Sequence, residues 1–352
     1  MTIIIAGGGT GGHLFPGMAV AEELVARGHA VRFVGAERGI EKTAVPKAGY
    51  ELDLIDVVGI KNQGIGGKAS GLFRAARSMR QARAILKQHD PDVVIGVGGY
   101  ASGPFVLAAA LSGWPTAILE QNSVPGITNK WLSRFVKAIF GTFKSAEKSF
   151  PKKKYHFVGN PVRKRVREAL ENASGEGSGV LVVGGSQGAH AVNELVFEAM
   201  KLLKAVGQAP RILHQTGKKD EEEFKRRYAE AGIEADVRAF IDDMGVAYRD
   251  ASVVVARAGA STIAEFTIIG KPAILIPLPI GTEQTVNAKE LADAGAAYCL
   301  PQASTSPTEL AEAMRGLLED RDTRRAMSAA SRALGRPRAH VEIADAIEAL
   351  AR

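Results

Sequence analysis

The sequence contains a single cysteine, Cys299, among its 352 residues. One thiol forms no disulfide within the chain, which excludes a disulfide-stapled secreted scaffold and fits a reducing compartment. No apolar run approaches the roughly 18 residues of a membrane span. The N-terminal segment Met1-Thr2-Ile3-Ile4-Ile5-Ala6 has no basic residue before its short apolar run, so we expect a first strand there rather than a signal peptide.

The sequence also has few features of a metal site. Its seven histidines are scattered, without the H-x-x-x-H or Cys/His spacings that bind zinc. The acidic pattern Asp320-Arg321-Asp322 lies in a charged helical run, far from any glycine-rich segment. We therefore expect no metal site built on histidine, and no other cofactor is expected.

Glycine and basic charge are abundant. Many of the 39 glycines directly follow apolar runs, where they indicate tight turns from strand to helix. A hydrophobic fraction of 46% and a charged fraction of 24% are typical of a globular protein, and the length suffices for two domains of about 150 to 180 residues. The formal charge of +7 suits phosphates, nucleic acid or anionic lipid, or no ligand at all, depending on where it lies.

Short β-rich apolar runs alternate with helical patterns along the whole chain. Most runs are near-continuous in valine, isoleucine and leucine, as in strands buried on both faces of a parallel sheet. The predicted strands span residues 2–6, 30–34, 51–57, 92–97, 116–119 and 137–140 in the first half and 180–183, 211–214, 236–240, 252–256, 273–276 and 297–300 in the second. The alternation predicts two doubly wound, Rossmann-like α/β domains.

The seam between the domains is expected near Gly159-Asn160-Pro161, which precedes a charged helix and a short Gly/Ser stretch. This predicts a first domain over residues 1–161 and a second over 162–337, with a C-terminal helix at about 338–352 that packs back on the first. A weak repeat supports two halves. Residues 3–13 and 180–190 each carry a strand, a glycine loop and a helix start.

The glycine loops place backbone N–H groups at helix N-termini, where they favour a phosphate or a developing anion. The first loop fits the G-x-G-x-x-G pattern with Gly7, Gly9 and Gly12. A dinucleotide site also needs an acidic residue that closes the second strand, whereas Glu37 falls beyond that strand. A dinucleotide site and a tight turn that binds nothing both remain open on this pattern alone.

His13 is the first polar side chain after the first loop. It can take a proton near neutral pH, or it can simply cap or pack the start of the helix. Two further clusters follow strands, Gly96-Val97-Gly98-Gly99-Tyr100-Ala101-Ser102-Gly103 and Arg257-Ala258-Gly259-Ala260-Ser261-Thr262. Glu265, one turn into the helix after the second cluster, can accept two ribose hydroxyls or can be an ordinary acid near a helix start.

Seven motifs occur in an order that resembles the MurG family, the N-acetylglucosaminyltransferases of bacterial peptidoglycan assembly. They are Gly8-Gly9-Thr10-Gly11-Gly12-His13 followed by Phe15-Pro16-Gly17; Gly98-Gly99-Tyr100-Ala101-Ser102-Gly103-Pro104; Glu120-Gln121-Asn122; Gly159-Asn160-Pro161-Val162-Arg163; Gly184-Gly185-Ser186-Gln187-Gly188-Ala189; Phe240-Ile241-Asp242-Asp243-Met244; and Arg257-Ala258-Gly259-Ala260 with Glu265. The resemblance covers essentially the whole chain.

The resemblance implies a GT-B fold, with two Rossmann-like domains facing a cleft, and an inverting transfer without a metal. The donor would be UDP-N-acetylglucosamine. The acceptor would be the 4-hydroxyl of the muramoyl sugar in undecaprenyl-pyrophosphoryl-N-acetylmuramoyl-pentapeptide (lipid I), and the product lipid II. It also implies an acceptor and membrane-docking role for the first domain, donor binding by the second, and a peripheral location on the cytoplasmic face of the bacterial inner membrane, where other cell-wall enzymes are candidate partners.

The family's donor-binding residues carry over by position. Ile241 matches the backbone contact to uracil, Glu265 the ribose ligand, Arg163 a phosphate contact and Gln284 a contact to a sugar hydroxyl. The remaining matches are to the diphosphate and sugar cradle (Ser186, Ala260, Ser261, Thr262, Ile263, Ala264) and to first-domain residues that approach the donor (Thr10, Gly11, Gly12, Asn122). Some members have two glutamines where this chain has Glu283-Gln284, which leaves its donor preference open.

An inverting transfer is a single displacement in which a base takes the acceptor proton while the departing UDP gains negative charge. Without a metal, helix N-termini and a cation must stabilise that charge. Ser186, the amides of residues 260–262 and Arg163 suit this role. We expect His13 to be the base, with Glu120 as the alternative.

Between Val57 and His89 there are seven basic residues and no acid. We define the predicted membrane patch as Lys68, Leu72, Phe73, Arg74, Arg77, Arg80 and Trp114. A solvated helix face is the simplest alternative, and nucleic-acid binding lacks any recognised module. Anionic lipid suits the mixture of basic and apolar side chains, at about 1 kcal/mol for each engaged basic residue.

Three other functions share parts of the pattern. A UDP-N-acetylglucosamine 2-epimerase also uses two Rossmann-like domains, but the basic and apolar patch favours a lipid-linked acceptor. A nicotinamide-dependent oxidoreductase would use the first glycine loop for its cofactor. A non-catalytic sensor would bind the nucleotide sugar without turnover.

Overall fold

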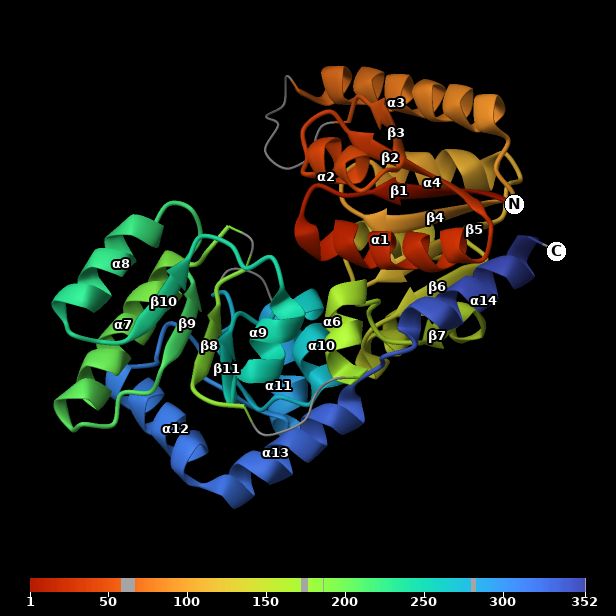
Figure 1. The fold of residues 1–352 in the computed structure, drawn as a ribbon. Coiled ribbons are helices and arrows are strands. Elements are labelled where there is room, and N and C mark those ends of the chain that lie inside the picture. The colour runs from red at the N-terminus through yellow and green to blue at the C-terminus, as the bar shows by residue number, and fades with distance from the viewer. Residues whose placement is uncertain (58–66, 172–176, 186, 280–282, 352) are drawn as a thin grey trace. The chain divides into compact units, whose positions relative to one another are not determined.

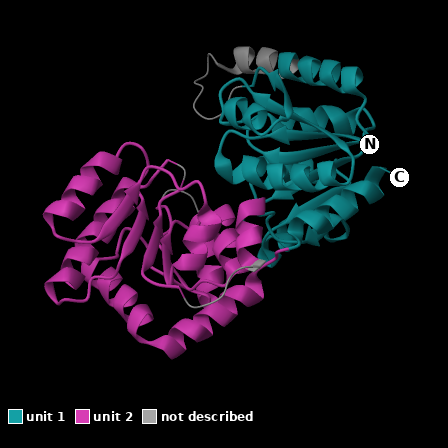
Figure 2. Cartoon of the chain, in the orientation of Figure 1, with its two compact units in different colours: residues 1–163, 338–352 teal, residues 164–337 magenta. Residues whose placement is uncertain are grey.

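The computed structural model describes residues 1–57, 67–171, 177–185, 187–279 and 283–351, and only the backbone of residues 67–76 and 171. The chain forms two compact units (Figure 2). Unit 1 consists of Met1–Arg163 with Arg338–Arg352, and unit 2 of Lys164–Pro337. Each unit is built on one parallel sheet that is covered by helices (Figure 1).

The sheet of unit 1 has seven strands in the order β3-β2-β1-β4-β5-β6-β7. All of its strand pairs are parallel. The strands are β1 (Thr2–Gly7), β2 (Ala30–Ala36), β3 (Glu51–Ile55), β4 (Val93–Gly98), β5 (Thr116–Glu120), β6 (Ala138–Gly141) and β7 (Tyr155–Phe157).

Helices cover both faces of this sheet, because successive strand side chains point to opposite faces. Ile3 and Ile5 pack with α1 (Gly11–Ala26), α2 (Glu41–Lys47) and the C-terminal helix α14 (Ala339–Ala351). Ile4 packs on the other face with α3 (Gly67–His89), α4 (Ser102–Leu111) and α5 (Ile127–Leu132). Figure 1 shows α1 and α3 on opposite sides of the sheet. Two 3-10 turns, η1 (Lys144–Ser149) and η2 (Lys152–Lys154), precede β7.

The C-terminal helix is attached to α1 by ion pairs as well as by its apolar face. Arg27, at the end of α1, contacts Asp345 at 2.7 Å and Glu348 at 3.2 Å. His29 Nε2 lies 2.8 Å from Glu348. The last helix is therefore an integral part of unit 1.

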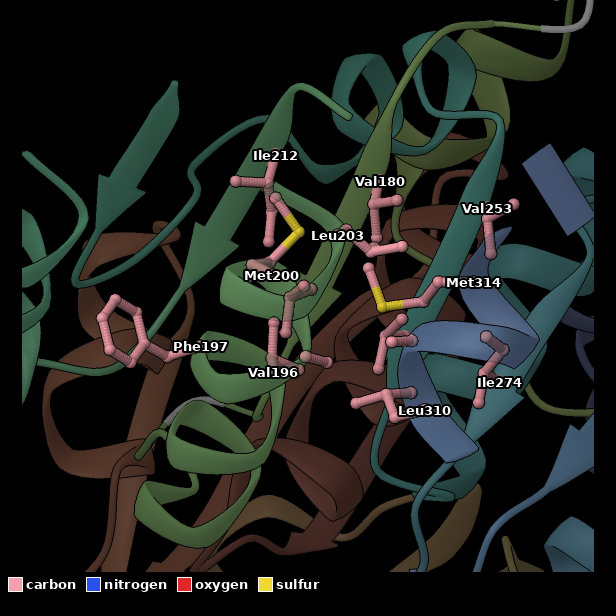
Figure 3. Packing of buried hydrophobic residues seen from close by; sticks show 14 of the residues in the cluster. Val180, Val196, Phe197, Met200, Leu203, Ile212, Val253, Ile274, Leu310 and Met314 are labelled. Carbon is pink, nitrogen blue, oxygen red and sulfur yellow. The ribbon is translucent and has the colours of Figure 1, made fainter. Parts of the chain in front are cut away.

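Unit 2 has a six-stranded parallel sheet in the order β10-β9-β8-β11-β12-β13. Its strands are β8 (Val180–Val183), β9 (Ile212–Gln215), β10 (Ala235–Arg238), β11 (Val253–Ala256), β12 (Ala273–Leu275) and β13 (Ala297–Cys299). Its helices are α6 (Lys164–Glu171), α7 (His190–Ala205), α8 (Glu221–Glu230), α9 (Met244–Asp250), α10 (Ala260–Ile269), α11 (Glu283–Asp293), α12 (Pro307–Glu319) and α13 (Arg321–Leu334). Figure 3 shows strand residues such as Val180 and Ile274 packing against Val196 of α7 and Met314 of α12.

In each sheet the first strand along the chain lies in the middle, and the order in which later strands are added reverses direction once. The reversal lies between β1 and β4 in unit 1 and between β8 and β11 in unit 2. In open parallel sheets, ligands bind outside the carboxyl ends of the strands at such a switch point. The glycine loops that the sequence singles out follow these four strands.

The predicted fold class is confirmed, and all twelve predicted strands are strands in the structure. The edge strand β7 was not predicted, because a three-residue run between the lysines of η2 and Gly159 carries no periodicity. Within the described residues, no helix is long and apolar enough to cross a membrane.

Candidate active site

The glycine loops of unit 1 touch each other through their backbones. Gly8 N–H donates to Gly98 O at 3.1 Å, which joins the loop after β1 to the loop after β4. A Cβ atom on Gly99 would lie 2.2 Å from Gly8 O, and Gly99 has a φ of +81°. Only glycine fits this contact, so the two motifs form one continuous backbone surface.

His13 lies on this surface, in the first turn of α1. A Cβ atom on Gly98 would lie 2.7 Å from its ring, so the ring packs directly over the second loop. Its Nδ1 is 3.3 Å from Oγ1 of Thr10, the N-cap of α1. Burial lowers the pKa of His13, and a hydrogen bond to the Gly8 backbone opposes that shift in part. The imidazole is therefore neutral at pH 7 and able to accept a proton. Of the other predicted residues, Gly11 and Gly12 are the first two of α1.

A buried acid, Glu41, fixes the first glycine loop by accepting a hydrogen bond from its backbone. Its Oε2 accepts the Gly9 N–H at 2.6 Å, and its Oε1 accepts the Ala36 N–H at 3.0 Å. A Cβ atom on Gly8 or Gly39 would lie within 2.6 Å of the carboxyl group, so the surrounding glycines leave room for it. This loop amide is already paired with an acid. That arrangement is unlike a dinucleotide site, where the acid would reach a ribose.

Glu120, the alternative base, is occupied by its own loop. Its Oε1 accepts the Asn122 N–H at 3.0 Å, and its Oε2 accepts the Gly126 N–H at 3.2 Å and Asn129 Nδ2–H at 2.9 Å. Burial raises the pKa of Glu120, and these hydrogen bonds oppose the shift. The geometry makes Glu120 the organiser of the segment from Asn122 to Asn129.

Arg163 ends unit 1, and its guanidinium lies 5.2 Å from the centroid of the Phe15 ring. Phe15 belongs to the same first turns of α1 as His13. Stacking on an aromatic face orients a guanidinium without neutralising it. This contact places the Arg163 guanidinium beside the first turns of the helix that carries His13.

In unit 2 the corresponding glycine loop is held by a neutral side chain. Gln215, at the end of β9, donates from Nε2 to Gly185 O at 2.9 Å. Its Oε1 accepts the N–H of Ile241, the predicted uracil contact, at 3.2 Å. One buried carboxamide therefore connects two predicted donor segments. Ser186 lies outside the described residues.

Helix α10 begins at the switch point of unit 2. Gly259 is its N-cap, and the first turn, with Ala260, Ser261 and Thr262, contains no acid. Ile263, Ala264 and Glu265 are buried on the same helix. Glu265 is the sixth residue of α10 and lies beyond the first turn. A favourable interaction with the helix dipole therefore does not explain why an acid occupies this position.

Gln284 lies on another element, α11. Its Oε1 accepts the Leu278 N–H at 3.0 Å, which attaches the start of α11 to the chain after β12. In the described part of the chain, no group of three or more His, Cys, Asp or Glu side chains is placed to hold a metal ion.

The structure describes the side chains of only three residues of the predicted membrane patch, Arg77, Arg80 and Trp114. Lys68, Leu72, Phe73 and Arg74 lie on α3, and their side chains are outside the described residues. Arg77 and Arg80 are exposed, and Arg77 is 3.5 Å from Asp56. The Trp114 indole N–H donates to Asp90 at 3.3 Å, beyond the far end of α3. Since 16 residues separate Phe73 from His89, that end is roughly 24 Å along the helix from Phe73.

Two parallel, doubly wound units, each with glycine loops at its switch point, form a GT-B fold, which glycosyltransferases use. The description "Glycosyltransferase family 28 N-terminal domain" matches residues 3–141, and "Glycosyltransferase family 28 C-terminal domain" matches residues 179–347. The chain belongs to glycosyltransferase family 28.

Relatives agree with this assignment over nearly their full lengths. A protein of Myxococcus xanthus (strain DK1622), named UDP-N-acetylglucosamine--N-acetylmuramyl-(pentapeptide) pyrophosphoryl-undecaprenol N-acetylglucosamine transferase, is 46% identical over 98% of this chain and 92% of its own. The crystal structure of Acinetobacter baumannii MurG matches with a TM-score of 0.80 and 34% identity over 99% of both chains. A UDP-N-acetylglucosamine 2-epimerase structure matches with a TM-score of 0.67 over 97% of this chain and 93% of its own. At 13% identity it shares the fold alone.

Replacing Glu41 with glutamine should destabilise the protein. Both carboxyl oxygens accept N–H groups, and a carboxamide offers one oxygen and one NH₂, so one buried N–H loses its acceptor. We expect the free energy of unfolding in urea to fall by about 1–3 kcal/mol. Glu37→Gln, at an exposed carboxyl of the same loop, is the control and should leave the midpoint unchanged. Equal stability of the two variants would contradict the role of Glu41.

Replacing Gln215 with leucine should weaken nucleotide binding. The change leaves Gly185 O and Ile241 N–H without their partner while it keeps the side-chain volume similar. Calorimetry with UDP should show a dissociation constant that is about tenfold higher or more, since each of the two lost hydrogen bonds is worth about 0.5–1.5 kcal/mol. Gln208→Leu removes an exposed carboxamide that contacts Glu319 and should bind UDP like the wild type. Unchanged affinity in the Gln215 variant would show that this bridge does not organise the donor site.

Proposed function

We propose that the protein transfers N-acetylglucosamine from UDP-N-acetylglucosamine to the 4-hydroxyl of the muramoyl sugar of lipid I, with inversion, to form lipid II. The observation that carries this proposal is 45–46% identity, over 98–100% of the chain, to proteins named for this transfer. The site supports it with a neutral imidazole in unit 1 and a helix N-terminus in unit 2.

Unit 2 is the better donor-binding unit on electrostatic grounds. A diphosphate needs N–H donors and no nearby acid. The loop of unit 2 is fixed by the uncharged Gln215, and the first turn of α10 contains no acid. The loop of unit 1 is fixed by the Glu41 carboxyl group, which would repel an anion placed at Gly9. Glu265 and Gln284 are then the proposed contacts for ribose and for a sugar hydroxyl.

His13 acts as the base in the proposed mechanism. It takes the proton of the acceptor hydroxyl as that oxygen forms a bond to the anomeric carbon. The bond from the anomeric carbon to the β-phosphate oxygen breaks, and both of its electrons leave with UDP. The amides of Ala260, Ser261 and Thr262 and the guanidinium of Arg163 stabilise the negative charge on the departing diphosphate.

Glu120 contributes as a positioning residue. Its carboxyl oxygens accept hydrogen bonds from Asn122, Gly126 and Asn129, so the carboxyl group is already engaged within its own segment. It keeps Asn122 next to the strand end, where the resemblance places a donor contact. These contacts support our proposal of His13, rather than Glu120, as the base.

We also place the protein at the cytoplasmic face of the bacterial inner membrane, as a peripheral protein. The relatives' names contain an undecaprenol pyrophosphate, which is a lipid-linked acceptor. The exposed Arg77, Arg80, Arg83 and Lys87 give α3 a basic face that suits anionic headgroups. Enzymes that make or consume the same lipid intermediates are candidate partners.

The reaction is tested directly by incubating the protein with labelled UDP-N-acetylglucosamine, a short-chain lipid I analogue and EDTA. The expected product carries a β-linked N-acetylglucosamine on the muramoyl 4-hydroxyl, and EDTA should not reduce the rate. Release of the 2-epimer of the sugar without acceptor would instead indicate an epimerase. UDP-sugar binding without turnover would indicate a sensor, and stabilisation against heat by NAD(P) an oxidoreductase.

His13→Ala should retain UDP binding and lower kcat by about 10²–10⁴-fold, the usual contribution of a positioned base. The imidazole must be neutral to act, and burial lowers its pKa below the ordinary value of 6.5. Activity of the wild type should therefore be constant above pH 6.5 and fall only as the pH drops further. A kcat like that of the wild type in His13→Ala would exclude this residue as the base.

His190→Ala is the matched control. His190 occupies the equivalent place after the glycine loop of unit 2, but its side chain is mostly exposed. The hydrogen bond to Asp220, at 2.9 Å, raises the pKa of His190. Its replacement should leave kcat and the acidic limb of the pH profile unchanged.

A further inference from the structure

Helix α5 and the residues after it present an apolar stripe to solvent, which we call the α5 stripe. It consists of Ile127, Trp131 and Phe135, which are 86%, 48% and 40% exposed. They are spaced by four residues and therefore lie on one side of the segment. The Trp131 and Phe135 rings pack together, with their centroids 5.2 Å apart.

The residues on the opposite side of the same segment attach it to the core of unit 1. Leu132 and Val136 are buried in the core beneath the sheet, and Asn129 is buried with its amide bonded to Leu119 O at 3.0 Å. The α5 stripe is thus not needed to attach the segment to unit 1. An exposed tryptophan and phenylalanine beside an isoleucine are costly in water unless something covers them.

The stretch of chain that carries the α5 stripe is rich in basic residues. From residue 121 to residue 163 the chain has nine lysines and arginines, Lys130, Arg134, Lys137, Lys144, Lys148, Lys152, Lys153, Lys154 and Arg163, and one acid, Glu147. Lys154 Nζ donates to the carbonyls of Ser133 and Arg134, both at 3.1 Å. This contact brings the exposed Lys152 and Lys153 to the end of α5.

A tryptophan and phenylalanine flanked by lysine and arginine are typical of a surface that lies in a lipid headgroup layer. Aromatic rings with a polar edge favour the interface, and basic side chains extend their apolar stems toward it while their charges meet anionic lipids. The near absence of acids makes an anionic surface the complementary partner. We propose that the α5 stripe docks into the interface of an anionic membrane, as a contact separate from the predicted membrane patch on α3.

The α5 stripe is also connected to the acceptor side of the site. Asn129 lies between Ile127 and Trp131, and its Nδ2–H donates to Glu120 at 2.9 Å. The same carboxyl group holds Asn122 and Gly126. Docking of α5 would therefore fix the loop after β5 relative to the membrane in which a lipid-linked acceptor lies. This second part of the inference rests on the proposed function, whereas docking itself does not.

The chain has two tryptophans, so each can be observed alone. In Trp114→Phe the remaining fluorophore is Trp131. In Trp131→Phe it is Trp114, which is partly buried and bonded to Asp90. The full-length variants would be mixed with vesicles of equal parts phosphatidylglycerol and phosphatidylcholine, with and without brominated acyl chains.

The proposal predicts a blue shift of Trp131 emission on vesicle binding and quenching by the brominated chains. Trp114 should show neither. Unchanged Trp131 emission while the protein cosediments with vesicles would overturn the proposal. Quenching of Trp114 in place of Trp131 would overturn the proposal and assign docking to the surface near the C-terminal end of α3, where Trp114 lies.

A double variant, Trp131→Ser with Phe135→Ser, tests the strength of the contact. We expect its partition onto the same vesicles to fall by about tenfold or more. Leu202→Ser with Val206→Ser is the matched control, because these side chains are 43% and 64% exposed at the same spacing on unit 2. Equal losses in both variants, or no loss in the first, would refute a specific role of the α5 stripe. UDP binding by each variant confirms that it is folded.

The link to the acceptor is tested with two substrates. For the double variant, kcat/KM for a soluble short-chain acceptor should equal that of the wild type. With full-length lipid acceptor in vesicles, KM for the acceptor should rise by about the factor lost in partition. An equal loss with both acceptors would make the stripe a structural element of the site. Failure of the wild type to use either acceptor would refute the proposed function and leave the vesicle measurements standing.

Docking to a protein instead of lipid has its own outcome. A protein contact would leave vesicle binding of the double variant equal to that of the wild type and would overturn the proposal. Replacing Lys130 and Arg134 with glutamate should reduce binding to the anionic vesicles. Undiminished binding of that variant would remove the basic side chains from the proposed contact.

Discussion

Each unit fixes its central glycine loop with one buried side chain, and the charge on that side chain decides what the loop can face. In unit 1 the Glu41 carboxyl group accepts the Gly9 N–H at 2.6 Å. In unit 2 the Gln215 carboxamide bonds to Gly185 O and to the Ile241 N–H, and it brings no charge. The strand, glycine loop and helix that recur in both units thus have similar backbones, but the side chain that fixes the loop is acidic in unit 1 and neutral in unit 2. Removing either side chain would leave buried polar groups without partners in the loop on which the chemistry depends.

This difference divides the chemistry between the units. A transfer without a metal needs a neutral base for the acceptor and N–H donors for the departing diphosphate. Burial lowers the pKa of His13, on the loop whose glycine amide is paired with an acid. Neither α10, whose N-cap is Gly259, nor α1 has an acid in its first turn, so the two units differ in the side chain that fixes the loop. These surroundings support the proposed donor site in unit 2 and the proposed base in unit 1, whereas the glycine patterns of the two units are alike.

The sequence predicted the features that depend on local pattern. Strands buried on both faces are continuous apolar runs, and glycine loops at their ends mark the switch points, so the fold and the neighbourhood of His13 were accessible. Glu41 and Gln215 were not, because each meets its loop through the fold, 32 and 30 residues away from the glycine it contacts. The pattern grouped Trp114 with the basic segment at residues 57–89, and the structure adds that its indole N–H donates to Asp90, directly after α3. The exposure of Trp131 and Phe135 could not be predicted. Apolar residues at 127, 131, 132, 135 and 136 have helical spacing and predict one wide apolar face, and only packing on the sheet decides which side of that face is buried.

The hydrogen bonds of Glu120 connect the loop after β5 to helix α5. As a candidate base it would be one acid among several, but its carboxyl group holds Asn122, Gly126 and Asn129. These three bonds turn β5, its loop and α5 into one rigid segment, with the site at one end and the α5 stripe along its exposed side. An enzyme whose acceptor is dissolved in a membrane must orient its acceptor loop toward a surface rather than toward bulk solvent. A buried acid whose hydrogen bonds couple that loop to an exposed aromatic pair would meet this requirement under the proposed docking of the α5 stripe.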